Sequence, residues 1–261
     1  MKHLKHLFNY ETEFIKSPNL PENEVTLVAI SCEAGESIKK LQSLGIECIK
    51  INNNVILPKP INSHPDIQML HISKNKIFCL KEHLFAGESE KFFDITEITE
   101  KTGNKYPDDV RLNCTVIDNK IICNPETISK NVLEFAESSG LTIIPVKQGY
   151  SKCSVCVINE SAIITDDTSI FRAAGNFLDD VLLISKGSIG LNGYNYGFIG
   201  GCCGKIAKNK IAFNGRIESH SDANKIIDFL EKHSIETIEL NCNKLYDIGG
   251  ILPIMQRKTY I

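Results

Sequence analysis

Four short segments of the chain share one pattern of apolar and polar positions. Each has an apolar run, a polar turn that contains Asn or Glu, and then Ile at the start of a second apolar run. This pattern predicts a β-hairpin, because β-branched residues flank a short polar turn. The four segments are HISKNKIFCL (71–80), VIDNKIICN (116–124), VINESAIITD (157–166) and KIAKNKIAFN (205–214).

The spacing of the four hairpins indicates internal repeats. Their central isoleucines, Ile77, Ile121, Ile163 and Ile211, follow one another at intervals of 44, 42 and 48 residues. A period in the forties is typical of a repeat architecture. Further elements are therefore expected to recur with each hairpin.

A helix and a strand are predicted to follow the second and the fourth hairpins. After the second, Asn124-Pro125 is expected to start a helix, Gly140 to end it, and residues 141–146 to form a strand. The order helix then strand also follows the fourth hairpin, where the strand is 235–240, and it recurs near the N-terminus. The apolar positions at helical spacing are Ile128, Val132, Phe135 and Ala136 in one helix and Ala223, Ile226, Ile227 and Leu230 in the other.

The two ends of the chain are predicted to share the fifth repeat. Residues 245–254 provide half of a hairpin, and the strand 25–30, followed by a helix (36–45) and a strand (47–51), provides the other half. Pairing of the two ends would leave no unpaired strand at the join. The sequence thus predicts an α/β fold, a fivefold pseudosymmetric ββαβ propeller closed by its terminal strands, as a single domain over 1–261 with an N-terminal extension (1–24) and repeats over 25–254.

Composition narrows the classes of partner. Hydrophobic residues make up 42% of the chain, as in ordinary globular proteins, and the formal net charge of −3 leaves no basic excess for nucleic acid. No apolar run reaches the length of a secretion signal core or of the ~20 residues that a membrane span needs. We therefore expect a cytoplasmic protein with reduced cysteines and a small-molecule ligand, and neither nucleic acid nor membrane as a partner.

The inner strands are predicted to carry a polar face. When they are aligned on the apolar residue before each turn, alternate positions share one face, and that face holds charges in three of five repeats. Asp66, Arg111 and Lys152 are expected to bind a ligand that has both a cationic group and a carboxylate, such as an amino acid or guanidino acid. An internal ion pair between Asp66 and Arg111 is the alternative. The other polar residues expected to line the channel are His64, Gln68, Asp109, Asn113 and Cys202.

The repeat pattern resembles the pentein superfamily, and in particular a bacterial branch of it. The turns SHPDIQ, KQGYSKCS, YGFIGGCC and LYDIGG carry the resemblance, together with the five units over residues 25–254. The superfamily includes arginine and agmatine deiminases, dimethylarginine hydrolase and amidinotransferases, and the ribosome anti-association factor shares its fold without chemistry. The resemblance implies a hydrolase or amidinotransferase that acts on C–N bonds of amidines or guanidines.

The catalytic Cys and His that the resemblance implies are missing from the equivalent strands of this sequence. Pentein enzymes use a Cys nucleophile near the C-terminal end and a His for proton transfer, yet DIGGILPI (247–254) has no Cys and FIGGCCGKI (198–206) has no His. Cys202 is the best remaining nucleophile, with His64 as its partner, unless Cys202 is only a small packing residue. The sequence leaves open an enzyme with altered catalytic residues or a noncatalytic binding or scaffold protein.

Other motifs indicate no cofactor. Cys153-x-x-Cys156 and Cys202-Cys203 resemble metal-binding pairs, but residues three apart on a strand face opposite sides, so we expect neither a metal site nor a disulfide between Cys153 and Cys156. GGCCGKI lacks the spacing of a phosphate-binding loop. The Gly-rich stretch 187–201 is predicted to be a long loop at the mouth of the channel.

Overall fold

The computed structural model describes residues 11–81 and 92–258. The strands are β1 (Thr12–Phe14), β2 (Val25–Ser31), β3 (Glu47–Ile51), β4 (Met69–Ser73), β5 (Lys76–Cys79), β6 (Asp94–Glu97), β7 (Thr115–Ile117), β8 (Lys120–Cys123), β9 (Thr142–Pro145), β10 (Val155–Asn159), β11 (Ala162–Thr165), β12 (Asp180–Leu183), β13 (Cys203–Ala207), β14 (Lys210–Phe213), β15 (Glu236–Glu239) and β16 (Leu252–Arg257). The helices are α1 (Gly35–Ser43), α2 (Pro65–Gln68), α3 (Lys130–Ser138), α4 (Thr168–Ala174) and α5 (Ala223–Lys232), with 3-10 turns η2 (Lys59–Ile61), η4 (Ile199–Cys202) and η5 (Ile217–Ser219).

Four of the sheets have one topology. In each, two antiparallel strands form a hairpin, and a third strand pairs in parallel with the second strand of that hairpin. The four hairpins, β4–β5, β7–β8, β10–β11 and β13–β14, confirm the hairpins predicted from the sequence. In three of these sheets a helix (α3, α4 or α5) connects the parallel strands.

Both ends of the chain contribute to the fifth sheet. β16 pairs in antiparallel with β2, so that Leu252 lies opposite Ala29, and β3 pairs in parallel with the other edge of β2. The predicted pairing of the two ends is therefore confirmed. β1, which falls in the segment predicted as an extension, pairs with the free edge of β16. The prediction of a strand over 245–254 is wrong in its first part, because β16 begins only at Leu252 and positive φ angles at Gly249 and Gly250 turn the chain just before it.

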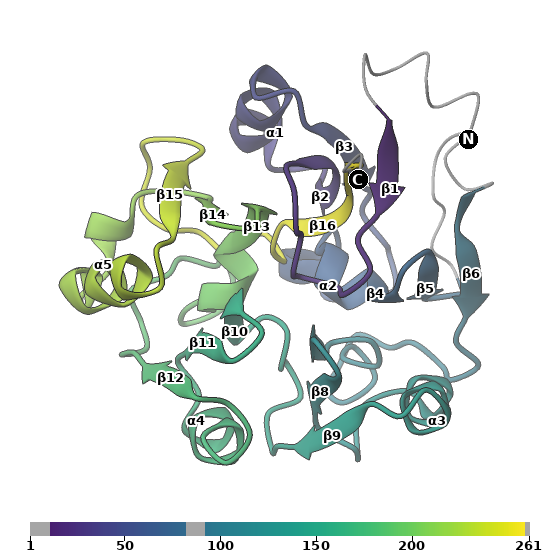
Figure 1. Ribbon diagram of the computed structural model, residues 1–261. Helices are drawn as coiled ribbons and strands as arrows, with labels where there is room; N and C mark the ends of the chain where they lie inside the picture. Colours follow the sequence, from purple (N-terminus) through teal and green to yellow (C-terminus); the bar gives the residue numbers. More distant parts are fainter. Residues whose placement is uncertain (1–10, 82–91, 259–261) are drawn as a thin grey trace.

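The five sheets lie around the middle of the molecule, and α1, α3, α4 and α5 lie on its outside (Figure 1). Neighbouring innermost strands lie against each other, as β7 does against β10 and β10 against β13. The described strands form five small sheets and no single closed sheet, so the closed propeller stays an expectation. No helix in the described part of the chain is long and apolar enough to cross a membrane.

Helix α3 shows how local chemistry sets an element's bounds. The prediction that Asn124-Pro125 starts this helix is wrong. The Asn124 side chain instead accepts a hydrogen bond from the backbone N–H of Glu126 in a turn, and Ser129 caps the helix by accepting from the N–H of Asn131. Gly140, with φ of +72°, follows the last helical turn as predicted.

The segments before the inner strands are turns rather than extended strands. Residues 65–68 form α2, residues 199–202 form η4, and turns over 106–112 and 151–154 take the place of the extended strands expected at 109–113 and 150–154. Successive side chains on a helical turn point about 100° apart, whereas those on a strand point to opposite faces. The prediction of one polar face assumed that side chains alternate between two faces, as on a strand, at 64–68, 109–113 and 150–154. That assumption is wrong for these segments.

Candidate functional site

Three of the predicted site residues, Asp66, Asn113 and Lys152, converge from the segments just before the inner strands. The Asn113 amide nitrogen donates to the backbone carbonyl of Asp66 (3.0 Å), and its oxygen accepts from the backbone N–H of Lys152 (2.8 Å). The Cys153 thiol donates to Asp66 Oδ2 over 2.9 Å. Asp66 and Lys152 also line one small cavity together. Asn113 thus ties the first, second and third hairpin units together.

Arg111 lies apart from this group, which corrects the prediction of a triad. Its guanidinium forms an ion pair with Asp108 and donates to the carbonyl of Thr127 (3.1 Å). It makes no ion pair with Asp66, so the alternative of an internal Asp66–Arg111 pair is also wrong. The cause is the turn at 106–112, which rotates Arg111 away from the direction that a strand would give it.

The other predicted residues have different surroundings. Gln68 donates to the carbonyls of Asn52 and Asn62 and so anchors α2 to the preceding loop. Asp109 is buried and accepts from the Tyr150 hydroxyl over 2.7 Å. Cys202 packs in an apolar cluster, and its thiol donates to the carbonyl of Ile199. Burial raises the pKa of the Cys202 thiol well above 9, so the thiol is protonated at neutral pH.

The two cysteines of the Cys153-x-x-Cys156 motif are both free thiols. Cys156 lies on β10, but Cys153 lies in the turn before that strand. The prediction that both stand on one strand is wrong for Cys153. The absence of a disulfide between them accords with the expectation, although the strand argument behind it does not apply.

Asp66 is a buried carboxyl with an unusual proton affinity. Only 1% of the residue is exposed, and burial together with the nearby charge of Asp247 raises its pKa from 3.8 to about 7, against the opposing charge of Lys152. The unfolded chain loses this proton near pH 4, while the folded protein keeps it until about pH 7. Stability therefore falls as pH rises between these values.

The variant Asp66→Asn is expected to reduce this dependence on pH. Removing the titrating group should flatten the slope of the free energy of unfolding by up to about 1.4 kcal/mol per pH unit between pH 4 and 7. Part of the slope should remain, because Asp166 also has a pKa raised to about 7 by burial. Urea denaturation of the wild-type protein and the variant at several pH values measures the two slopes. An unchanged slope in the variant would mean that Asp66 is ionised in the folded protein.

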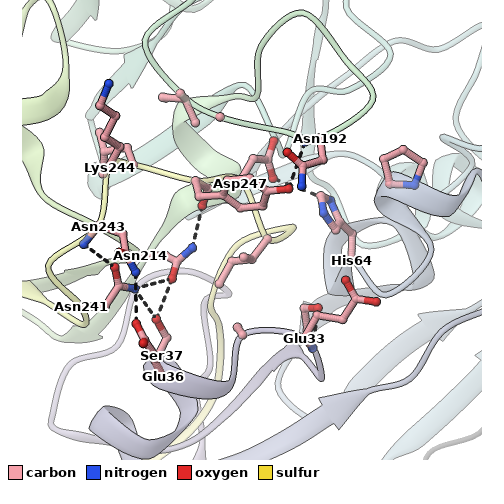
Figure 2. A pocket seen from close by; sticks show the side chains of 18 of the residues that line it. Glu33, Glu36, Ser37, His64, Asn192, Asn214, Asn241, Asn243, Lys244 and Asp247 are labelled. Atoms are coloured by element: carbon pink, nitrogen blue, oxygen red, sulfur yellow. Dashed lines mark hydrogen bonds and ion pairs between the residues drawn. The ribbon is translucent and has the colours of Figure 1, made fainter.

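His64 and Asp247 form a second buried pair, which joins the first unit to the last. The His64 Nδ1 atom lies 3.7 Å from Asp247 Oδ1, and only 3% and 1% of the two residues is exposed. Figure 2 shows the imidazole directed toward the carboxylate. Burial lowers the pKa of His64, against the opposing charges of Asp247 and Glu33, so the ring is neutral at pH 7. Its Nδ1 atom has no hydrogen-bond partner among the described residues.

A large polar cavity of about 970 Å³ opens on one side of this pair. The β2–α1 turn, the predicted loop at 187–201 and the chain just before β16 form its walls, and His64 and Asp247 lie at its inner end. Three carboxylates line it, Glu33, Glu36 and Asp247, against one lysine, Lys244. Amide and hydroxyl side chains make up much of the remaining lining, and those of Ser37, Asn214 and Asn241 hydrogen-bond to one another (Figure 2). The residues that carry them are Ser31, Ser37, Ser63, Ser188, Asn192, Asn195, Asn214, Asn241 and Asn243.

A smaller cavity of about 230 Å³ lies on the other side of the pair. His64, Asp247 and Asn195 line both cavities, so the pair stands at their junction. The rest of the inner lining is Ile61, Ile67, Tyr150, Cys153, Leu191, Tyr194, Tyr196 and Phe198. We call this space the inner chamber. The loop predicted at the channel mouth therefore contributes to both cavities.

Backbone donors and a glycine fix Asp247 in place. Its Oδ1 accepts from the N–H of Gly249 (2.9 Å), and its Oδ2 accepts from the N–H of Phe198 (3.0 Å). A Cβ at position 201 would lie 2.0 Å from Oδ1, so only glycine leaves room for the carboxylate. The sequence LYDIGG contains Asp247, but the strand register gave no reason to select it. The sequence offers one local signal, an acid two residues before a Gly-Gly pair, but the burial of Asp247 depends on a contact with a distant loop.

The fold of the chain is that of the pentein superfamily. It is similar to the inosamine-phosphate amidinotransferase from Streptomyces griseus, with a TM-score of 0.60 and 11% identity over 95% of this chain and 98% of that chain. The agmatine deiminase from C. jejuni gives a TM-score of 0.55 and 10% identity over 97% of this chain and 98% of that chain. A mutant of DDAH from Pseudomonas aeruginosa, solved in complex with citrulline, gives a TM-score of 0.54 and 8% identity over 90% of this chain and 100% of that chain.

The family follows from the sequence itself. The model of the family described as "Family of unknown function (DUF6873)" matches residues 29–252, and the chain belongs to that family. No curated protein matches the chain in sequence.

Proposed function

We propose that this protein binds a small guanidino or amino-acid-like molecule whose planar cation is held by Asp247. The observation that carries the proposal is the position of this buried carboxylate, at the junction of the two cavities and fixed there by two backbone donors. A preorganised buried carboxylate suits a cation, because it has already lost its water.

The hydrogen-bonding capacity of Asp247 supports a planar cation. An ionised carboxylate offers about four acceptor sites, and two backbone N–H groups use one on each oxygen. The remaining site on each oxygen suits two parallel N–H donors, as a guanidinium or amidinium presents them. Acidic residues outnumber lysine along the outer cavity, which also favours a positively charged ligand.

His64 provides a proton acceptor beside the cation. Its ring is neutral, so one of its two nitrogen atoms can accept a hydrogen bond or a proton from a bound ligand. The amides of Asn192 and Asn195 supply donors and acceptors for the polar remainder of the ligand, such as an α-amino acid group.

Thiol-dependent turnover is a second candidate, and the position of Cys153 favours it. Cys153 lines the inner chamber with His64, and its thiol already donates to Asp66. Burial and the charge of Asp66 raise the pKa of this thiol well above 9, so the thiol needs both a bound cation and transfer of its proton to Asp66 before it can act as a nucleophile. Cys202 lines neither of the two cavities. If the protein only binds its ligand, the ligand forms no covalent adduct with Cys153.

Isothermal titration with pairs of ligands that match in shape and differ in charge tests the binding. Methylguanidinium is expected to bind at least about tenfold more tightly than methylurea, which has the same shape without the charge, and arginine more tightly than citrulline. Equal affinities within each pair would contradict the proposal. If the Cys153 thiolate attacks the guanidinium carbon of arginine or agmatine, a C–S bond forms, a C–N bond breaks, and ammonia leaves with the proton that the thiol had given to Asp66. A mass shift of the protein reports the remaining adduct, which Cys153→Ser should abolish and Cys202→Ser should leave unchanged.

A further inference from the structure

The lining of the inner chamber is mainly aliphatic and aromatic, apart from the Cys153 thiol, the tyrosine hydroxyls and the polar groups at its junction with the outer cavity. Ile61, Ile67 and Leu191 form one part of its lining, and aromatic rings form another. The rings of Tyr150 and Phe198 stack with centroids 6.1 Å apart, and Tyr196 meets Phe198 edge-on at 5.9 Å. His64, Asn195 and Asp247 supply polar groups at the junction. A ligand that fills the chamber therefore meets charge at one end only.

The volume of the chamber sets the size of its occupant. An apolar cavity of roughly 150 Å³ is enough to hold benzene. At about 230 Å³, the chamber accommodates a six-membered ring with a short substituent. Methylguanidinium alone would leave most of this apolar surface without contact, which is unfavourable.

We propose that the ligand of this protein is an aryl-substituted cation, whose amidinium or guanidinium group pairs with Asp247 and whose ring occupies the inner chamber. This inference rests on the proposed function and names its ligand class. The aromatic lining suits such a ligand because ring faces pack on an aryl group and attract the adjacent positive charge. The outer cavity then holds the polar remainder of the molecule.

The Asp109 carboxylate acts here as a positioning group for the chamber. It accepts from the Tyr150 hydroxyl over 2.7 Å and so fixes the ring that stacks on Phe198. Tyr194 lies at the mouth of the chamber with 43% of its surface exposed, so the wall on this side is open to an entering ligand. Asp109, which the sequence placed in the channel, thus acts on the ligand through the ring of Tyr150.

Titration with benzamidine and acetamidine tests the inference. The two cations share the amidinium group and differ in the ring, so benzamidine is expected to bind at least about tenfold more tightly. Leu191→Phe, which fills the chamber, and Tyr196→Ala, which removes part of its wall, should both lower the ratio of the two affinities. Phe177→Ala removes an exposed aromatic residue outside both cavities and should leave the ratio unchanged. Circular dichroism checks that each variant folds.

The outcomes separate this inference from the proposal on which it rests. Equal binding of acetamidine and benzamidine would overturn the aryl ligand class and leave the cation site standing. Binding of benzyl alcohol as tight as that of benzamidine would overturn the pairing of the ring with a charge. Failure of the wild-type protein to bind any amidinium or guanidinium would overturn the cation site and the inference together.

Discussion

The variant Asp247→Asn is expected to lose its affinity for methylguanidinium by about 2–5 kcal/mol, because removing one partner of a buried, hydrogen-bonded charge pair leaves the other charge uncompensated. The amide nitrogen of Asn would also face the backbone N–H of Phe198 or Gly249, where two donors meet. An additional loss of stability of about 1–3 kcal/mol is expected from that mismatch. Isothermal titration and urea denaturation measure the two effects separately.

Glu33→Gln is the matched control for this variant. Glu33 also lines the outer cavity, but it is exposed, so loss of its charge is expected to change the affinity by less than about 1 kcal/mol. A larger effect at Glu33 than at Asp247 would place the cation on the rim of the cavity. That result would contradict the role given to Asp247.

The variant Gly201→Ala is expected to destabilise the protein by about 1–3 kcal/mol or more and to displace the Asp247 carboxylate. The new methyl group would lie 2.0 Å from Oδ1 and 2.3 Å from Cγ of Asp247. The backbone cannot move aside, because the Gly201 carbonyl accepts from the N–H groups of both Ile248 and Gly250. Binding of methylguanidinium should fall together with stability.

Gly35→Ala tests whether this effect is specific to the site. A Cβ at Gly35 meets no atom within 4 Å and the residue has no positive φ, so the substitution is expected to be neutral or to stabilise α1 by up to about 1 kcal/mol. Urea denaturation compares the two variants. Equal stability of Gly201→Ala and Gly35→Ala would mean that the carboxylate is not held where the structure places it.

The sequence predicted the repeats well, because the hairpins depend on local patterns. The β-branched runs and polar turns that predict β4–β5, β7–β8, β10–β11 and β13–β14 are short-range signals, and the split unit followed from counting them. The pairing of β2 with β16 could be predicted because an unpaired strand at each end is unfavourable. Element bounds were less certain, as the start of α3 shows.

The site was harder to predict, because it lies in the turns before the inner strands. A strand register assigned Arg111 to the channel, but the turn at 106–112 directs it to Asp108. Asp66, Lys152 and Asn113 do converge, because they belong to equivalent turns of neighbouring units. Asp247 was missed because its burial depends on a backbone donor from a loop 49 residues away in sequence, which no local pattern encodes.

A crystal structure of the protein grown with methylguanidinium tests the cation site most directly. We expect a planar cation at the junction of the two cavities, with two of its nitrogen atoms within hydrogen-bond distance of the Asp247 oxygens and the His64 ring beside it. A cation bound instead at Asp66 and Lys152, or one seated on Glu33 and Glu36 with Asp247 making no contact, would contradict it.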